Sequence, residues 1–371
     1  MVQGHAAKGH PDEHSHPHRH GGATRAGSKY PLYRYLLLFC LFSSVLPFIV
    51  INTITYVITR GVIKEKSFNQ LVSIRDIKKT EVEDYFFERR ADAFQLTNNS
   101  VFKSVARAYS EAFNKGGLNG AAYEDVDRKY GGILVSFAEA YKYYDVMIMD
   151  MNGDIIASAR GRPELGKNVL EKPFAGTPLE KAFVSGKTGI DILDMRWYAL
   201  GGHPAMFMSA PITKNIADTT VAVIVFHMDN RKINDIMTQR SGLAKTGESY
   251  LVGQDFLLRS DSRFIKGPSV LKTEADTSAV REALAGNIST GIIRDYRDIK
   301  VLSAFAPLNV SYSVRWALVV EMDKREALTM ESSTKEQFLY IYASLVLAWL
   351  IVILVFHQLM AGKLLKQERH D

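Results

Sequence analysis

The sequence contains a single cysteine, Cys40, so no disulfide can form within the chain. It has no Gly-x-x-x-x-Gly-Lys phosphate loop and no dinucleotide-binding glycine fingerprint, and no Ser/His/Asp set can be argued from its scattered residues. A basic stripe with interleaved aromatic residues is also missing, although the formal net charge is +6. We therefore expect neither an enzyme nor a nucleic-acid-binding protein, and we expect no cofactor.

Charged side chains are missing from two long runs, residues 35–59 and 337–362. Each run exceeds the roughly 20 residues that a helix needs to cross a bilayer. We predict transmembrane helices at 35–59 and 337–358, which makes the membrane a partner. A buried core helix would explain one such run better than two that flank a soluble segment. A cleaved signal peptide does not fit the first run, which is too long and lacks a small-x-small site after it.

Two membrane spans place both ends of the chain on one side and residues 60–335 on the other. Basic residues are nearly balanced around the first span, but Lys363, Lys366 and Arg369 after the second favour a cytoplasmic C-terminus. We expect a bacterial inner-membrane protein with residues 60–335 in the periplasm or outside the cell. Residues 359–371 then form a cytoplasmic tail too short for a kinase, a methyl-accepting coiled coil or a cyclase.

The N-terminal tail, residues 1–34, is rich in histidine, glycine and proline and cannot form a core, so we predict a disordered cytoplasmic segment. Its most concentrated run contains four histidines at alternate positions: His14, His16, His18 and His20. Neutral imidazoles at this spacing could chelate a borderline metal ion. The alternative is a solvated tail that binds metal only incidentally.

Two similar hairpins divide the middle of the chain. In residues 247–264, two short apolar runs flank Gly253-Gln254-Asp255, and in residues 146–158 two apolar runs flank a turn that contains Asn152-Gly153. The turn in residues 146–158 begins with Asp150-x-Asn152-x-Asp154, which resembles a calcium loop. However, its glycine is Gly153 rather than the residue after Asp154, and its twelfth position, residue 161, is Gly where a bidentate Glu would belong, so a simple turn is the better interpretation.

Further landmarks follow each hairpin in the same order. The pairs are Ser158 and Ser260, Ala182 and Ala283, Pro211 and Pro307, and Asp229 and Asp323. Matching order and spacing indicate a duplicated domain. We predict an α+β fold of two tandem PAS-like modules, a distal one over 114–240 and a proximal one over 241–330, each with an antiparallel sheet, a short helix and a final apolar strand. The aspartates that end the modules are well placed to cap the helices that follow.

Two long helices are expected to flank the modules. Residues 60–113 lack proline and show apolar residues at helical spacing, which predicts one amphipathic helix that ends at Gly116, Gly117 and Gly120. Its apolar stripe would pack on the modules or on a second copy of itself in a homodimer. The helix after Asp323 has no proline or glycine to stop it before the second span, so we expect it to continue into the membrane.

At this point the chain resembles the double Cache sensor domains of bacterial chemoreceptors, sensor histidine kinases and nucleotide cyclases. The resemblance rests on Thr246-Gly247-Glu248-Ser249-Tyr250-Leu251-Val252-Gly253, on Leu258-Arg259-Ser260-Asp261-Ser262-Arg263, and on Ile77-Lys78-Lys79 with Tyr85-Phe86, and it covers residues 60–335. It implies a dimer that senses a small molecule outside the cytoplasm, usually in the distal module, as in chemotaxis and two-component systems.

The candidate ligand-binding residues lie in the distal module. Arg196 could pair with a ligand carboxylate, and Trp197 or Tyr198 could wall the pocket. Arg196-Trp197-Tyr198 is similar to the Arg-x-Trp-Tyr element of family members that bind amino acids, with the spacer missing. The alternative is a hairpin tip with core aromatics. The other candidates are Asp194 beside them and three residues on neighbouring strands: Tyr144, Asp145 and Met206, of which Met206 could instead fill the core.

In the proximal module, Arg259, Asp261 and Arg263 occupy alternate positions, so we expect salt bridges within that module. The interpretation that fits all of these features is a membrane-anchored sensor. Its ligand is expected to be an amino acid, an organic acid or an amine, and its signal would pass through the second span to a partner. The alternative is a truncated, non-signalling binding or scaffold protein that dimerises with a full-length receptor.

Overall fold

A computed structural model describes residues 31–161, 163–214 and 219–367. The histidine run of the N-terminal tail lies outside the described residues, so the metal prediction stays a prediction. The chain divides into two compact units, residues 1–57 and 58–371. In the first unit, the described residues belong to the N-terminal part of helix α1 (Pro31–Asn98).

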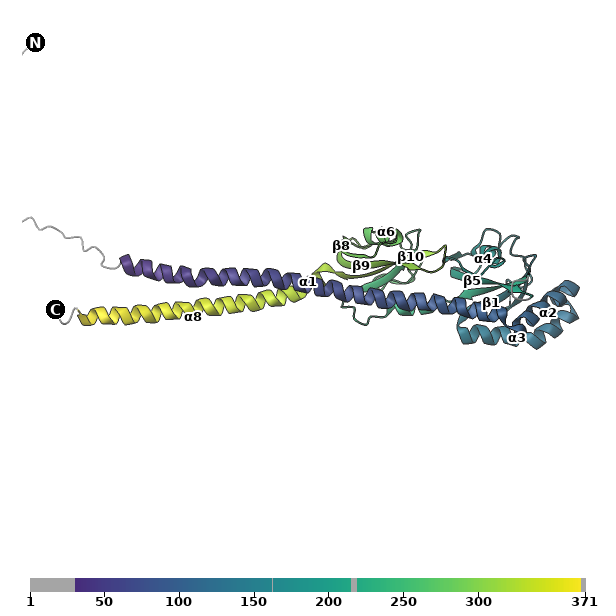
Figure 1. The fold of residues 1–371 in the computed structure, drawn as a ribbon, viewed down its shortest axis with the longest axis horizontal. Helices are drawn as coiled ribbons and strands as arrows, with labels where there is room; N and C mark the ends of the chain where they lie inside the picture. Colours follow the sequence, from purple (N-terminus) through teal and green to yellow (C-terminus); the bar gives the residue numbers. More distant parts are fainter. Residues whose placement is uncertain (1–30, 162, 215–218, 368–371) are drawn as a thin grey trace, which may run out of the picture. The chain divides into compact units, whose positions relative to one another are not determined.

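Two helices of the described chain are long and apolar enough to cross a membrane, judged by length and composition (Figure 1). One stretch is Leu46–Asn98 within α1, and the other is Leu339–Phe356 within α8 (Thr329–Gln367). Both stretches expose large apolar side chains, among them Ile51 and Leu347. The two candidate spans overlap the uncharged runs of the sequence.

The predicted single helix over 60–113 is wrong, because the chain breaks at Asn99. Helix α1 ends at Asn98, and α2 begins at Ser100 and ends at Gly116. Asn99 is extended, and its side-chain oxygen accepts hydrogen bonds from the backbone N–H groups of Val101 and Phe102. An asparagine in this position satisfies the free donors of a new helix, which favours the break. A short turn of 3-10 helix, η1 (Gly117–Asn119), and an unexpected helix, α3 (Ala121–Tyr141), follow.

The distal module is built on an antiparallel sheet of six strands. The strands are β1 (Tyr143–Asp150), β2 (Ile155–Ser158), β3 (Asp191–Ile192), β4 (Arg196–Tyr198), β5 (His203–Thr213) and β6 (Thr220–Met228). Their order is β2-β1-β6-β5-β3, with β4 paired to β5. Helix α4 (Pro178–Gly186) packs against β5 and β6. Asp150 accepts the N–H groups of Asn152 and Asp154, so this segment is a turn, as expected.

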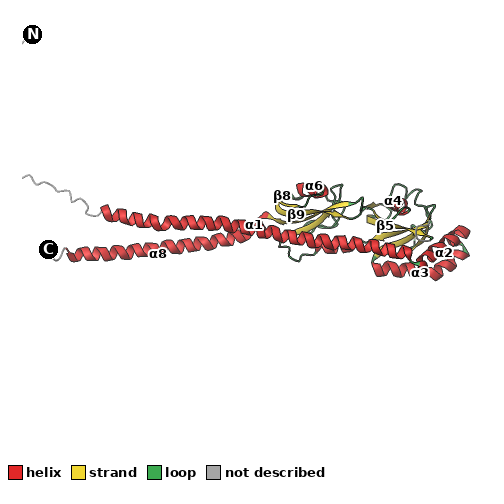
Figure 2. Ribbon diagram, viewed as in Figure 1, coloured by secondary structure: helices red, strands yellow, loops and turns green. Residues whose placement is uncertain are grey.

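Helix α5 (Arg231–Thr238) leads from β6 into the proximal module, whose antiparallel sheet has four strands (Figure 2). The strands are β7 (Glu248–Val252), β8 (Ser289–Arg294), β9 (Lys300–Asn309) and β10 (Arg315–Asp323), in the order β7-β10-β9-β8. Helix α6 (Ser278–Leu284) contacts β9 and β10. In both modules the last strand pairs with the first strand and with the strand before it, as the predicted duplication requires.

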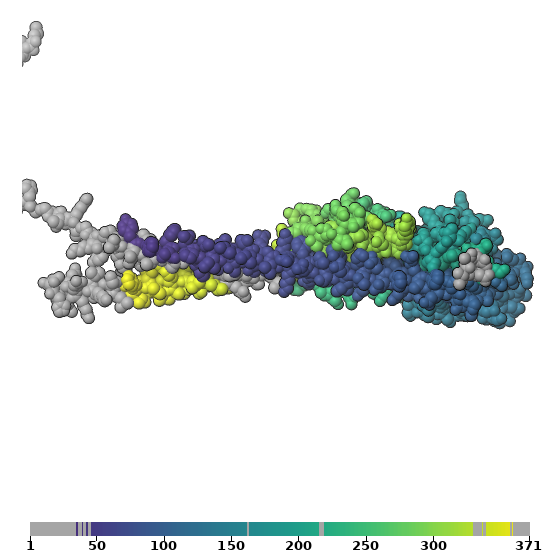
Figure 3. Space-filling model, viewed as in Figure 1, coloured from purple at the N-terminus to yellow at the C-terminus, as the bar shows by residue number. Residues whose placement is uncertain are grey.

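Helix α1 contacts both modules, and its surface lies across them in Figure 3. Phe86 packs edge to face on Trp316 of β10, with ring centroids 5.6 Å apart. Lys78 is buried and donates hydrogen bonds to the carbonyl oxygens of Ile236 and Gln239 at the end of α5. The stripe of Leu71, Val82 and Phe86 belongs to one core cluster with inward-facing residues of both sheets. One face of each sheet therefore rests on the helices.

The chain after β10 differs from the predicted continuous helix. Helix α7 (Lys324–Ala327) stops at Leu328, and α8 starts at Thr329. Glu326 in α7 accepts hydrogen bonds from the N–H groups of Lys245 and Thr246, which fix this short helix to the proximal module.

Of the two predicted aspartate caps, only that of Asp229 is formed. Asp229 accepts a hydrogen bond from the N–H group of Arg231 at 2.8 Å, at the start of α5, although Asn230 occupies the cap position itself. Asp323 makes no capping bond and pairs instead with Arg297.

Candidate ligand-binding site

The distal module encloses a cavity of about 260 Å³ between its sheet and the chain that follows β2. Strands β1, β4, β5 and β6 and the segment after β2 supply the lining. The polar and aromatic lining residues are Tyr144, Asp145, Arg160, Glu164, Tyr198, His203, Phe207 and His227. Three of the residues predicted from the sequence, Tyr144, Asp145 and Tyr198, are among them.

Strand alternation decides which residues of β5 reach this cavity. Successive side chains of a strand point to opposite faces of the sheet. His203 and Phe207 therefore line the cavity, whereas Met206 lies in the core on the helix side. The structure thus takes Met206 out of the predicted site and gives it the core-filling role that was the alternative.

Asp145 is buried and anchors the cavity wall. Its carboxylate accepts hydrogen bonds from the N–H groups of Val146 (2.7 Å) and Arg160 (3.0 Å) and from the hydroxyl of Ser158 (2.8 Å). Burial raises the pKa of Asp145, and these three hydrogen bonds oppose that effect. The carboxylate therefore fixes the segment after β2 against β1, and its first role is structural.

Two stacked histidines form the cavity wall on β5 and β6. The rings of His203 and His227 lie 5.3 Å apart at 24°. Burial, and then His203 and Arg160 nearby, lower the pKa of His227 to about 3, so its ring is neutral at physiological pH. Nδ1 of His203 lies 3.0 Å from the carbonyl oxygen of Pro204, and the buried Nε2 of His203 has no hydrogen-bond partner among the described residues.

Arg160 and Glu164 bring opposite charges to the cavity. The guanidinium of Arg160 lies 3.8 Å above the ring of Tyr144, a cation–π contact between two lining residues. Tyr198 is buried, and its hydroxyl donates to Glu164 at 3.2 Å. Burial, and then Glu164, raise the pKa of Tyr198. The cavity thus offers a guanidinium, a carboxylate and aromatic walls to a small polar ligand.

The other three predicted residues, Asp194, Arg196 and Trp197, line a different cavity. Its volume is about 670 Å³, and it lies where the distal and proximal modules meet, with Gln254, Asp255 and Arg315 in its wall. Adjacent residues of strand β4 point to opposite sides, so Tyr198 faces the distal cavity while Trp197 is half exposed at the junction. The predicted cluster is therefore divided between two cavities.

At this junction, Asp194 binds two residues of the proximal module. Its carboxylate accepts hydrogen bonds from Nε and Nη2 of Arg259 at 2.9 and 2.7 Å, and from the indole N–H of Trp316 at 2.8 Å. Arg259 is fully buried and also pairs with Asp255 at 2.9 Å. The salt bridge predicted within the proximal module is thus formed by Arg259 with Asp255, and Arg259 also pairs with Asp194 of the distal module, which the sequence did not predict.

Asp261 and Arg263, the other two residues expected to form salt bridges in the proximal module, make none among the described residues. Asp261 bonds Asn234 and Ser269, and Arg263 donates to backbone carbonyl groups.

The sequence prediction did not include Arg160, Glu164, His203, Phe207 or His227 among the site residues. A polar residue directly after the apolar run 221–226 could have pointed to His227, and alternation along β5 could have pointed to His203 and Phe207. Arg160 and Glu164 lie in an irregular segment, so no periodicity reveals them. Among the described residues, no group of three or more His, Cys, Asp or Glu side chains could hold a metal ion.

A family model described as Cache domain matches residues 62–330. This match covers most of the chain, so the protein belongs to the Cache domain family, and the predicted resemblance is confirmed. The matching model is of the double Cache kind. No curated protein sequence matches the chain.

Solved structures of similar fold include three bacterial sensor domains. The ligand-binding domain of the Pseudomonas fluorescens chemoreceptor CtaA with L-isoleucine is 14% identical, with 73% of this chain and 98% of that one covered and a TM-score of 0.48. The sensor domain of the V. cholerae histidine kinase DctB is 14% identical, with 70% and 98% covered and a TM-score of 0.49. The ligand-binding domain of the Pseudomonas aeruginosa chemoreceptor PctB is 11% identical, with 71% and 97% covered and a TM-score of 0.47.

Proposed function

We propose that this protein is a membrane-anchored bacterial sensor that binds a small ligand in the distal cavity and passes a conformational signal through β10 to α8. One observation supports the proposal. Strand β4 lines the polar cavity, and a residue just before it, Asp194, is hydrogen-bonded to the proximal module, including Trp316 of β10. Tyr198 lines the cavity, and Asp194, four residues earlier, bonds Arg259 and Trp316. A shift of β4 on ligand binding would act directly on β10.

The size and polarity of the cavity favour an amino acid, an organic acid or an amine. A volume of about 260 Å³ admits only a small molecule. Arg160 can pair with a carboxylate, Glu164 can accept hydrogen bonds from an ammonium or hydroxyl group, and His203 Nε2 is a ring nitrogen without a partner among the described residues that a polar ligand group could bond. The aromatic rings of Tyr144 and Phe207 would cover the apolar part of the ligand.

The two apolar helices serve as membrane anchors in this proposal, with residues 60–335 outside the cytoplasm of a bacterial cell. The signal then leaves through the second span to a partner in or beneath the membrane. Accessibility of Tyr312, which is fully exposed on the proximal module, tests this topology. In a Cys40→Ser background, a Tyr312→Cys variant should react with a membrane-impermeant maleimide on intact spheroplasts. Labelling only after lysis would contradict the proposed orientation.

A homodimer is part of the proposal, because α1 leaves an apolar stripe uncovered. Ile77, Phe87 and Phe94 recur at helical spacing and are 59%, 72% and 61% exposed. Phe87 and Phe94 lie seven residues apart, which places them on the same face of a helix. Large exposed aromatic side chains in such a row favour a matching helix from a second copy.

The ligand test uses the full chain in lipid nanodiscs and a library of amino acids, organic acids and amines. We expect at least one compound to raise the unfolding temperature saturably. Tyr198→Phe removes the hydroxyl that bonds Glu164 and should weaken binding about tenfold. Tyr312→Phe, the same change at an exposed site, should leave it unaltered. Saturable binding that both variants preserve would place the site outside the distal cavity, and no binding at all would remove the proposal.

A further inference from the structure

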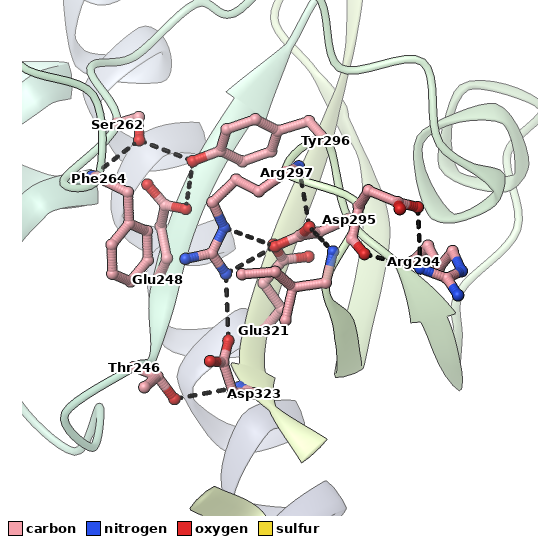
Figure 4. Close-up of polar contacts among 12 residues, drawn as sticks. Thr246, Glu248, Ser262, Phe264, Arg294, Asp295, Tyr296, Arg297, Glu321 and Asp323 are labelled. Carbon is pink, nitrogen blue, oxygen red and sulfur yellow. Dashed lines mark hydrogen bonds and ion pairs between the residues drawn. The ribbon is translucent and has the colours of Figure 1, made fainter. Parts of the chain in front are cut away.

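The proximal module buries a polar cluster on the sheet face turned away from α1 (Figure 4). Three carboxylates belong to it: Glu248 on β7, Asp295 after β8 and Glu321 on β10, which are 2%, 5% and 0% exposed. Arg297 faces them and pairs with Asp295 at 2.6 Å, and the guanidinium of Arg263 acts on Glu248. Three buried carboxyl groups beside two guanidinium groups leave an excess of negative charge that burial strongly disfavours.

The cluster occupies the position in the proximal sheet that the ligand cavity occupies in the distal sheet. Glu248 lies opposite Glu321 in the pairing of β7 with β10, as Asp145 lies opposite His227 in the pairing of β1 with β6. Glu321 also lies opposite Ser303 of β9, as His227 lies opposite Phe207 of β5. The duplicated fold therefore puts this cluster at the position in the second module that corresponds to the distal cavity.

Glu321 is the group of the cluster that lacks compensation. Its Oε2 accepts a hydrogen bond from the hydroxyl of Tyr250 at 3.1 Å, whereas its Oε1 and the hydroxyl of Ser303 are buried without hydrogen-bond partners among the described residues. No ion pair reaches Glu321 within the described chain. Burial raises the pKa of Glu321 well above its ordinary value, and Asp295 and Glu248 raise it further.

The guanidinium of Arg263 also faces Glu248, and it donates hydrogen bonds to the backbone carbonyl oxygens of Gly247 and Lys245. Strand β7 presents Glu248 and Tyr250, and the turn after β8 presents Asp295, Tyr296 and Arg297. The segment after β7 contributes Ser262, which bonds Tyr296, and the backbone N–H of Arg263, which bonds Glu248.

The same cluster holds the start of the output helix. Arg297 bonds Asp323 at 3.2 Å, directly before α7. The N–H of Asp323 donates to Thr246 Oγ1 at 3.1 Å, and the hydroxyl of Thr246 donates to Glu326 of α7 at 2.5 Å. Arg297 is thus shared between the buried carboxylates and the residue that fixes α7 (Figure 4).

We propose that the proximal module is a second sensory site whose ligand is the proton: Glu321 holds a proton in the arrangement described here, and its release draws Arg297 away from Asp323 and frees α7. The step moves one proton between the carboxyl group and solvent and needs no other reactant. It is independent of any ligand in the distal cavity, so failure of the ligand test leaves it standing.

Infrared spectroscopy of the full chain in nanodiscs tests the proton itself. At neutral pH the wild type should show the C=O stretch of a protonated carboxyl group, and this band should disappear as the pH rises. Glu321→Gln, a neutral replacement of the same shape, should abolish the band, and Glu282→Gln on the exposed side of the same module should leave it unchanged. Tyr250→Phe removes a donor that stabilises the ionised form and should move the midpoint upward by roughly one pH unit.

Pulsed electron paramagnetic resonance tests the coupling to α7. Spin labels would be attached in a Cys40→Ser background through Ser289→Cys on β8 and Lys324→Cys on α7. The distance distribution should change over the pH range in which the band disappears, and Glu321→Gln should keep the low-pH distribution throughout. The proposal is wrong if no protonated carboxyl band exists at neutral pH, if Glu321→Gln retains it, or if the distribution stays constant across the titration.

Discussion

Asp194 and Arg259 form a two-point contact between the modules, with carboxylate oxygens 2.9 and 2.7 Å from Nε and Nη2 of the guanidinium. The arginine is fully buried, so these hydrogen bonds replace the water that would otherwise solvate the charge of the guanidinium. Gly253 makes room for it, because a Cβ at that position would lie 2.1 Å from Arg259 Nη2. The junction therefore links a residue just before β4 of the distal module rigidly to the proximal module, so that a movement of one sheet is felt by the other.

We expect Asp194→Asn to destabilise the protein by about 3 kcal/mol, because it leaves a buried guanidinium with Asp255 as its remaining carboxylate partner. Chemical denaturation of the full chain in detergent measures this loss. Asp276→Asn, which breaks the exposed pair with Arg281, is the matched control and should cost less than about 1 kcal/mol. Equal effects of the two substitutions would contradict the role given to the junction.

Gly201→Ala should abolish ligand binding in the distal cavity. An added Cβ would lie 2.7 Å from His203 Nε2 and 2.8 Å from the ring of Tyr198, so the cavity wall must shift. Calorimetric titration with the ligand found in the library should show a loss of affinity of tenfold or more. Gly189→Ala places its Cβ in open space and should bind as the wild type does. Undiminished binding by Gly201→Ala would exclude this wall from the site.

The stability of the protein should fall as the pH drops below about 6.5, and His227 should contribute to this fall. The folded-state pKa of about 3 lies below the unfolded value of 6.5, so the unfolded chain binds a proton that the folded chain refuses. The stability is complete above the unfolded pKa and is lost progressively down to the folded one, with a loss of about 2 kcal/mol at pH 5.

Denaturation of wild type and His227→Phe at several pH values measures this contribution. The variant keeps an aromatic ring that cannot titrate, so its stability should depend less on pH between 6.5 and 3. His227 carries no such linkage if the two pH profiles run parallel.

Phe87→Glu and Phe94→Glu should each shift the protein from dimer to monomer, since a buried carboxylate at a helix interface has no partner. Analytical ultracentrifugation in detergent measures the assembly state. Tyr312→Glu adds the same charge to an exposed site on the proximal module and should leave the dimer intact. A dimer that survives both phenylalanine substitutions would require another interface.

The sequence alone was enough for features that depend on local pattern. The two uncharged runs, the duplicated hairpins and the landmarks from Ala182 to Asp323 can all be recognised in the sequence without a structure, and the family comparison agrees with the Cache resemblance over residues 62–330. Even here a single residue changed the result, because the side chain of Asn99 ends one helix and starts another where helical periodicity predicts no interruption.

Only the tertiary structure decided which side chains share a site. Trp197 and Tyr198 are neighbours in sequence, but strand geometry turns them to opposite sides, so one reaches the junction and the other the distal cavity. Arg259 meets Asp194 across 65 residues, and Glu321 meets Glu248 through strand pairing. Such meetings depend on how the sheets fold and pack, and no local pattern in the sequence encodes them.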